Sequence, residues 1–208
     1  TFLITESANE KYFDASVQMQ RKSKNSYFIS DTLSQKISET KNSQGVFAVC
    51  KMKNENISLK TDQKYIALDN LQDPGNLGTV IRTAEALGIS SVIVGGGCDV
   101  FNPKVLRASM GSVLRLDVFE CQSLAPVLQK AKSLGIKTYA TSPDSSAKKI
   151  NETQFPKSSL CVIGNEANGV SDEVMNICDE TVTIPMLGRA ESLNAHVAGA
   201  IVMWEMLR

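Results

Sequence analysis

From Tyr65 to the end of the chain, short apolar segments of strand length alternate with segments of helical pattern, and this alternation constrains the fold most strongly. The expected strands are residues 65–69, 91–94, 113–119, 137–141, 160–164 and 181–185. The expected helices are residues 76–87, 103–110, 124–134, 171–177 and 192–207. Such alternation predicts an α/β fold in which helices cover both faces of a parallel sheet.

Two glycines mark the ends of expected helices, and the architecture of parallel sheets indicates where the site lies. Gly88 and Gly135 each follow a helical segment, where a left-handed C-terminal residue belongs. In parallel α/β sheets, ligands bind beyond the carboxyl ends of the strands, where the connecting loops converge. We therefore expect the functional site in the loops that follow the strands.

Residues 1–57 differ from the rest of the chain in how apolar and polar segments are arranged. Their apolar runs, at residues 2–4, 27–29 and 46–49, are separated by polar stretches of helical pattern. The mainly polar segment from residue 53 to residue 64 is expected to join two domains. The sequence therefore predicts a small first domain at residues 1–57, a linker at 58–63 and a larger domain at 64–208.

Composition and charge exclude several classes of protein. Hydrophobic residues make up 42% of the chain and charged residues 21%, which is ordinary for a soluble globular protein. No apolar run approaches the ~18 residues of a membrane helix, and we expect no signal peptide. The net charge is zero, which disfavours attraction of nucleic acid by the field of the whole protein but leaves local basic clusters at residues 21–24 and 51–53.

The five cysteines are widely spaced and form no CxxC pair, so we expect neither a zinc site nor a thioredoxin-type site. Cysteines of this kind are typical of buried free thiols in a reducing compartment. We therefore expect no bound metal and a cytoplasmic location.

The stretch LDNLQDPGNLGTVIRTAEALGI, residues 68–89, follows an expected strand and begins a helix. Its turn makes Asn76 a plausible N-cap. Gly78 lowers helix propensity, so we expect something to approach the backbone there, and Arg82 lies on the same helix face. A phosphate or a ribose would fit beside them; the alternative is a capped helix with Arg82 paired to Glu85. The dinucleotide-binding pattern GxGxxG is absent.

The stretch CVIGNEANGVSDEV, residues 161–174, surrounds the end of another expected strand. The strand is expected to end at Gly164, which places Glu166 at its carboxyl end, the position of a ligand-facing carboxylate. Gly169 suits a left-handed turn, and Ser171 begins a helix. The alternative is a turn in which Glu166 caps backbone amides.

The stretch IPMLGRAESLNAHVAGAIVMWE, residues 184–205, leads into the last helix, for which Ser192 is the expected N-cap. Small residues line that helix and it lacks a clean polar face, so we expect it to be buried in the core or in an interface. His196, the only histidine, shares a helix face with Met203 and Leu207. We interpret it as a core or interface residue rather than a catalytic base.

Together and in this order, the three stretches resemble the three motifs of the SpoU/TrmH-type RNA ribose 2′-O-methyltransferases, within the SPOUT superfamily. The patterns DPxNxGxxxRxAxAxG, GxExxG and IPMxGxxxSLNxxxA occur at residues 73–88, 164–169 and 184–198. The resemblance covers residues 64–208. Residues 1–57 resemble the C-terminal part of the small L30e-like ribosomal-protein domain that binds RNA upstream of many such enzymes.

The resemblance implies a SPOUT α/β-knot, in which the C-terminal segment threads through a loop to form a deep trefoil knot. It also implies that S-adenosylmethionine binds in the knotted cleft and that the chain forms a homodimer. The implied function is transfer of a methyl group to a ribose 2′-hydroxyl of RNA. Ribosomal RNA is favoured over transfer RNA because the L30e-like domain accompanies ribosomal RNA enzymes.

The resemblance also implies which residues form the site. It assigns cofactor contacts to Thr141, Gly164, Asn165, Glu166, Ile184, Met186, Ser192 and Leu193. It assigns the catalytic group to Asn76, Arg82, Glu166, Ser192 and Asn194. The position of His196 is commonly a small residue in the family, so His196→Ser is expected to retain methyl transfer.

General chemistry suggests a role for each catalytic residue. A guanidinium seldom releases its proton, so Arg82 is expected to clamp a phosphate and stabilise alkoxide charge, although the family arginine is sometimes assigned as the base. Asn76, Ser192 and Asn194 would position ribose and cofactor, and Glu166 would organise its loop or hold Asn76. The alternatives are a transfer RNA methyltransferase, a non-catalytic RNA-binding SPOUT protein and a nicotinamide-dependent enzyme, the last disfavoured by the missing glycine pattern.

Overall fold

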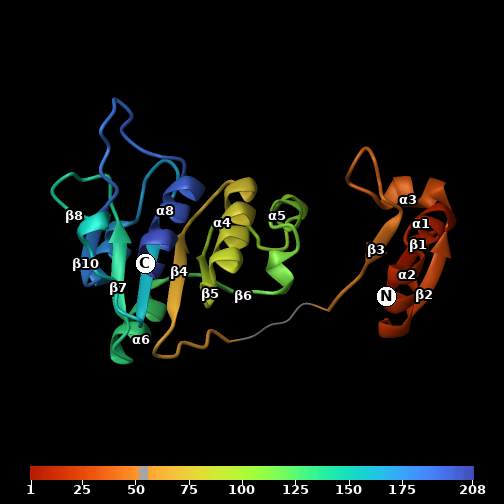
Figure 1. Cartoon of the computed structure of the whole chain (residues 1–208), viewed down its shortest axis with the longest axis horizontal. Helices are drawn as coiled ribbons and strands as arrows, with labels where there is room; N and C mark the ends of the chain where they lie inside the picture. The colour runs from red at the N-terminus through yellow and green to blue at the C-terminus, as the bar shows by residue number, and fades with distance from the viewer. Residues whose placement is uncertain (52–55) are drawn as a thin grey trace. The chain divides into compact units, whose positions relative to one another are not determined.

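The computed structural model describes residues 1–51 and 56–208, and the chain divides into two compact units between Asn54 and Glu55 (Figure 1). The start of the polar segment expected to join two domains, residues 53–55, lies outside the described residues. The expected linker, residues 58–63, belongs to the second unit. Leu59 is buried there, and the amide of Lys60 donates a hydrogen bond to the hydroxyl of Tyr65 at 2.8 Å.

The first unit is a small three-stranded α/β fold. Its elements are β1 (Phe2–Thr5), α1 (Glu6–Lys11), α2 (Phe13–Lys22), β2 (Ser26–Ile29), α3 (Asp31–Ile37) and β3 (Val46–Ala48). The strand order is β2-β1-β3, with β1 parallel to β2 and antiparallel to β3. Phe2, Ile4 and Ala8 form its buried apolar cluster, so the central strand and the first helix make the core.

The second unit is built on a seven-stranded sheet of order β6-β5-β4-β9-β7-β10-β8, in which every strand pairing is parallel. Its strands are β4 (Lys64–Asp69), β5 (Ser91–Gly95), β6 (Asp117–Cys121), β7 (Lys137–Thr141), β8 (Lys148–Lys149), β9 (Ser159–Ile163) and β10 (Glu180–Thr183). Its helices are α4 (Pro74–Leu87), α5 (Pro103–Ala108), α6 (Ala125–Ser133), α7 (Asp172–Ile177) and α8 (Ala195–Leu207), with short 3-10 turns at Ser112–Leu114 and Ile150–Glu152. No described helix of either unit is long and apolar enough to cross a membrane.

Helices cover both faces of the large sheet, as the alternation of strands and helices predicts (Figure 1). Successive residues of a strand point to opposite faces. On β4, Ile66 and Leu68 pack in a cluster with α4, α5 and α8, whereas Tyr65 and Ala67 pack in another with α6 and α7. The predicted parallel α/β fold is therefore confirmed for this unit.

The strand register brings several loops to one edge of the sheet. Leu68 of β4 pairs with Ile163 of β9, Val162 of β9 pairs with Ala140 of β7, and Thr141 of β7 pairs with Val182 of β10. The carboxyl ends of these four strands therefore lie level. The loops that follow them, separated along the sequence, meet at one place.

Local capping corrects both predicted helix starts near the site. Asp73, not Asn76, caps α4: its side chain accepts a hydrogen bond from the amide of Asn76, and Pro74 occupies the first turn. Asn194, not Ser192, caps α8 by accepting from the amide of His196 at 2.9 Å. The side chains of Asn76 and Ser192 are thereby released from capping. The positive φ angles of Gly88 and Gly135 confirm the predicted helix ends.

The predicted strand at residues 113–119 is wrong in its first half. Residues Ser112–Leu114 form a 3-10 turn after Gly111, which adopts the left-handed conformation, and β6 begins only at Asp117. The hydroxyl of Ser112 also donates to Glu85, which holds the turn against α4. Val113 and Leu116 of this stretch pack on the core from outside the strand, whereas Leu114 is exposed. The two-residue edge strand β8 was not predicted from sequence.

Gly78 allows α5 to pack closely on α4. A Cβ atom at Gly78 would lie 2.5 Å from the Cβ of Ala108 and 2.7 Å from the carbonyl oxygen of Val105. The expectation that Gly78 leaves room for a phosphate or a ribose is therefore wrong, because α5 occupies that space. The glycine has a packing role.

We predict that Gly78→Ala lowers the free energy of unfolding of the second unit by about 1–3 kcal/mol, because the backbone of α5 has to move. Gly199→Ala is the matched control: its Cβ would lie 3.5 Å from Val80, an ordinary contact, and alanine favours the helix by up to about 1 kcal/mol. Urea unfolding monitored by the fluorescence of Trp204, the only tryptophan, measures both changes. Equal effects of the two substitutions would contradict the packing role.

Candidate cofactor and active site

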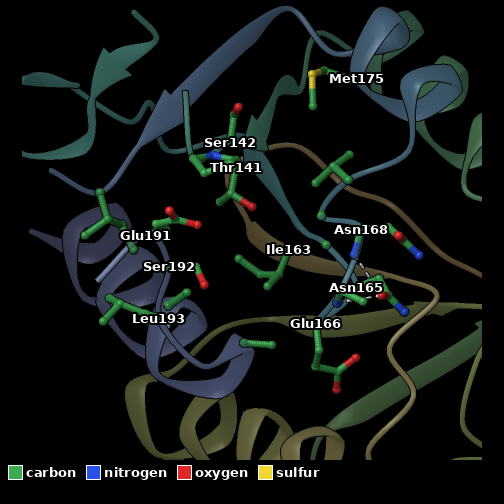
Figure 2. A pocket seen from close by; sticks show the side chains of 18 of the residues that line it. Thr141, Ser142, Ile163, Asn165, Glu166, Asn168, Met175, Glu191, Ser192 and Leu193 are labelled. Atoms are coloured by element: carbon green, nitrogen blue, oxygen red, sulfur yellow. Dashed lines mark hydrogen bonds between the residues drawn. The ribbon is translucent and has the colours of Figure 1, made fainter. Parts of the chain in front are cut away.

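A cavity of about 290 Å³ lies at the carboxyl ends of β7, β9 and β10, between the loops that follow these strands (Figure 2). The structure brings all eight residues that the resemblance assigns to the cofactor to its wall: Thr141, Gly164, Asn165, Glu166, Ile184, Met186, Ser192 and Leu193. They come from three separate segments: the end of β7, the loop after β9 and the segment between β10 and α8. The level strand ends of β7, β9 and β10 account for this convergence.

Other lining residues were missed by sequence reasoning. They are chiefly Ser142, Ile163, Asn168, Glu191 and Ala198, which flank the assigned residues along the same three segments, and Met175 of α7 (Figure 2). For the first five, closeness in sequence to an assigned residue is a usable signal. Met175 carries no such signal, because its approach depends on how α7 packs.

The cavity wall combines apolar surface with negative charge. Ile163, Ile184 and Leu193 provide apolar side chains, whereas Glu166 and Glu191 provide carboxylates. No lysine or arginine is found among the described residues that line it. A concave site with charge of one sign concentrates the opposite sign. The cavity is therefore suited to a molecule with an apolar portion and a positive charge.

The loop after β9 is held in a tight turn. The amide of Asn165 donates to the carbonyl of Gly169 at 2.9 Å, and the amide of Gly169 donates back at 3.0 Å. Gly169 has φ +70°, which confirms the predicted left-handed turn. A Cβ at Gly164 would lie 2.1 Å from the carbonyl carbon of Gly169. Glycine at position 164 thus permits the backbone contact that shapes this wall of the cavity.

Glu166 links this loop to the first turn of α4. The amide nitrogen of the Asn76 side chain donates to Glu166 at 2.8 Å, and the backbone amides of Gln72 and Asp73 donate to the same carboxylate at 3.2 and 3.1 Å. Burial alone raises the pKa of Glu166, but these hydrogen bonds outweigh it and lower the pKa below its ordinary value. The geometry combines both predicted options, because Glu166 holds Asn76 and also caps backbone amides.

His196 contacts the side-chain amide of Asn76 at its oxygen, opposite the nitrogen that donates to Glu166. Its Nδ1 lies 3.0 Å from the side-chain oxygen of Asn76, and the imidazole is half-buried. Sequence reasoning placed His196 in the core or in an interface and did not predict this contact. The two residues are 120 positions apart, and neither spacing nor composition signals their pairing.

Ser192 and Asn194 lie on the segment between β10 and α8. Ser192 is exposed and lines the cavity, whereas Asn194 is exposed and uses its side-chain oxygen to cap α8. The amide nitrogen of Asn194 makes no hydrogen bond with any described residue. Both positions can therefore donate to a bound molecule.

Arg82 is not among the residues that line the cavity. It is exposed on α4 and makes no hydrogen bond or ion pair within the described part of the chain. The predicted alternative, a salt bridge from Arg82 to Glu85, is wrong, because Glu85 pairs with Arg115 at 3.0 Å. The guanidinium of Arg82 is thus available for a partner outside this chain.

The described residues contain no cluster of histidine, cysteine and carboxylate side chains that could hold a metal ion.

The fold and the site together define a parallel α/β domain with an acidic, partly apolar cofactor-type pocket at the ends of adjacent strands. The chain belongs to the SpoU rRNA methylase family, whose sequence model matches residues 63–204.

Named relatives support this assignment. The chain is 36% identical over 181 residues to the 23S rRNA (guanosine(2553)-2′-O)-methyltransferase RlmP of Bacillus subtilis (strain 168), covering 86% of this chain and 71% of the relative. The structure of this chain is similar to that of the SpoU methyltransferase AviRb from Streptomyces viridochromogenes. The TM-score is 0.84 at 28% identity, and the match covers 99% of this chain and 80% of AviRb. A structure of AviRb in complex with the cofactor AdoMet gives a TM-score of 0.78, 26% identity and coverage of 99% and 81%.

We predict that Glu166→Gln destabilises the second unit in a pH-dependent way. The pKa of Glu166 in the folded state is below its ordinary value of 4.5, so its contribution is fully present above that pH and is lost as the pH falls through the lower folded-state pKa. The carboxylate is exposed and screened, so we expect at most about 1 kcal/mol at pH ~7. The difference from the wild type should vanish in acid.

Urea unfolding of the wild type and Glu166→Gln between pH 7 and pH 3 tests this prediction. Glu173→Gln is the control, because Glu173 is an exposed carboxylate of α7 that bonds to no described residue. It should change stability little throughout. A difference between Glu166→Gln and the wild type that persists unchanged into acid would contradict the assigned role of the carboxylate.

Proposed function

We propose that this chain is an S-adenosylmethionine-dependent methyltransferase that acts on a ribose 2′-hydroxyl of ribosomal RNA. The observation that carries the proposal is the convergence of the eight motif residues on one cavity, with the Glu166–Asn76 pair bonded at its edge. Membership of the SpoU rRNA methylase family supports the reaction type. The relative RlmP is named for 2′-O-methylation of 23S rRNA, which favours ribosomal RNA over transfer RNA.

The residues of the cavity fit S-adenosylmethionine. Adenine is apolar on its faces, and Ile163, Ile184 and Leu193 offer it apolar contact. The sulfonium and amino groups of the cofactor are positive, and Glu166 and Glu191 supply the only charges among the described lining residues. We assign the cofactor contacts to the eight motif residues on this basis.

When bound, S-adenosylmethionine supplies an electrophilic methyl group attached to a positively charged sulfur. The protein has to hold the ribose hydroxyl within ~3–3.5 Å of that methyl and in line with the bond that breaks. The side chain of Asn76 donates a hydrogen bond to Glu166 at the edge of the cavity, which suits it to orient the ribose. The hydroxyl of Ser192 and the amide of Asn194 can donate to ribose or cofactor from the neighbouring segment.

We propose that Arg82 binds an RNA phosphate beside the target ribose and stabilises negative charge on the reacting oxygen. Its exposure and its lack of a charged partner within the described residues support this role. Guanidinium binds phosphate through paired hydrogen bonds and retains its proton, so another group accepts the proton of the hydroxyl.

The first unit is proposed to be an RNA-binding domain of the L30e-like type. Its mixed three-stranded α/β fold and the cations at the end of α2, Arg21 and Lys22, support this proposal. We propose residues 1–57 as this domain and 64–208 as the catalytic domain, joined by residues 58–63, which pack within the second unit. The five free cysteines support the proposed cytoplasmic location.

The deep trefoil knot of the SPOUT fold is also proposed for residues 184–208. After β10, which lies beyond β7 in the sheet, the chain crosses the cavity and α8 then packs on α4 and β9 in the middle of the unit. To form a knot, the chain has to pass back across the loops that follow β7 and β9, and this path is consistent with that. The proposal that the chain threads through a loop rests on the family resemblance.

A homodimer through the knotted domain is proposed because α8 has an uncovered apolar face. Val197, Trp204 and Leu207 are 38%, 63% and 37% exposed, and their spacing places them along one side of the helix. Contiguous exposed apolar surface of this kind marks an interaction site.

The wild type and two variants of Arg82 test the function. The wild type should transfer labelled methyl groups from S-adenosylmethionine to ribosomal RNA, and mapping of 2′-O-methyl groups should locate them on ribose. Arg82→Ala should lower transfer by at least about 100-fold, because a charge-stabilising donor is lost. Cofactor affinity measured by calorimetry should stay nearly unchanged. Arg82→Lys keeps the charge without the paired geometry and should be intermediate.

The outcomes separate the possible readings. Full activity of Arg82→Ala would show that the arginine is not catalytic. Cofactor binding without methyl transfer to any RNA would show a non-catalytic RNA-binding protein, and transfer only to transfer RNA would overturn the proposed substrate.

Trp204→Glu should convert the dimer to a monomer, because it places a charge at the centre of the apolar face of α8. Sedimentation velocity measures the change. Leu134→Glu is the matched control, since Leu134 is 39% exposed at the end of α6, on the opposite face of the sheet. Loss of the dimer in both variants, or in neither, would contradict an interface at α8.

A further inference from the structure

A chain of hydrogen bonds joins three segments of the second unit. Glu166, in the loop after β9, accepts from the side-chain nitrogen of Asn76 at 2.8 Å. The side-chain oxygen of Asn76 lies 3.0 Å from Nδ1 of His196, in the first turn of α8. The side-chain amide of Asn76, in the first turn of α4, is therefore bonded through both its nitrogen and its oxygen.

Chemistry determines the direction of each bond. An ionised carboxylate can only accept, and hydrogen bonds keep the pKa of Glu166 low, so the NH₂ group of Asn76 must face Glu166. The carbonyl oxygen of Asn76 then faces His196 and can only accept. Nδ1 of His196 must therefore carry a hydrogen. A histidine ring whose tautomer is set by its partner orients that partner in turn.

The placement of His196 connects this chain of bonds to the cavity. Its neighbour in sequence, Ala195, lines the cavity, as does Ala198 one turn further on, so the first turn of α8 borders the site. His196 itself is half-buried beside Asn76 and is not among the described lining residues. It is thus placed to act on the site through Asn76.

We propose that His196 is a positioning residue for methyl transfer: its Nδ1–H holds the amide of Asn76 in the orientation that Glu166 requires. This inference rests on the proposed function and on the role of Asn76 in orienting the ribose. An amide torsion is broad and roughly two-fold, so a single bond from Glu166 leaves Asn76 free to tilt. The second bond removes that freedom and fixes the direction in which Asn76 meets the substrate.

Two substitutions separate the donor from the rest of the ring. His196→Ala removes the bond and should lower kcat about tenfold, because a reacting group held loosely loses alignment. His196→Asn places an amide nitrogen on the γ-carbon, where Nδ1 stands in histidine, and should restore kcat to within about threefold of the wild type. Both should leave the KM for S-adenosylmethionine and the free energy of unfolding close to wild-type values. Equal loss in His196→Asn and His196→Ala would overturn the proposal.

A double-mutant cycle tests whether His196 acts through Asn76. In an Asn76→Ala background, His196→Ala should cause no further fall in kcat, because the group that it positions is gone. A further tenfold fall would show that the imidazole acts directly, for example as the proton acceptor. Wild-type kcat in the single variant His196→Ala would overturn the inference and support the expectation, drawn from sequence, that the residue is dispensable.

The tautomer gives a readout that does not depend on activity. His196 is the only histidine in the chain, so its ring nitrogens give one unambiguous set of signals in ¹⁵N NMR. At a pH where the ring is neutral, the wild type should show the Nδ1–H form, and Asn76→Ala should lose this preference. An Nε2–H form in the wild type would contradict the proposal. If the wild type methylated no RNA, the proposed function would be overturned. The NMR experiment would still show whether Asn76 sets the tautomer of His196.

Discussion

The site depends on the position of β9, which lies between β4 and β7 and pairs in parallel with both. This placement puts the loop after β9 in the middle of the carboxyl edge, between α4 on one side and the loops after β7 and β10 on the other. Glu166 can therefore reach α4, while Asn165 and Gly164 face the cavity from the same loop. A strand order without this insertion would separate the cavity from Asn76, one of the proposed catalytic residues.

The sheet and its helices could be predicted from sequence because burial on two faces leaves a strong apolar pattern. The exact ends of helices could not, since several side chains compete for each cap. Asn76 and Asp73 are both good caps, and Pro74 decides between them by favouring the first helical position. Ser192 and Asn194 compete in the same way, and in the structure Asn194 caps α8 while Ser192 lines the cavity.

The candidate site was only partly predictable. The resemblance grouped the cavity residues correctly in space, because each motif follows a strand and the strand ends are level. Gly78 was misinterpreted because a glycine in a helix signals a close approach without saying what approaches, and here it is α5. His196 was interpreted from sequence as a core or interface residue. Its contact with Asn76 could not be predicted, because the two residues lie 120 positions apart and only the packing of α8 on α4 brings them together.

The partners of Glu166 explain how the cavity keeps its negative charge. A carboxylate paired with lysine or arginine would lose most of its field, and Glu85 and Asp73 are paired in that way elsewhere on α4 and in its cap. Glu166 instead accepts from neutral groups, namely two backbone amides and the side chain of Asn76. These donors stabilise the ionised form and leave its charge uncompensated. The same bonds that organise Asn76 thus preserve the electrostatic property that suits the cavity to a positively charged cofactor.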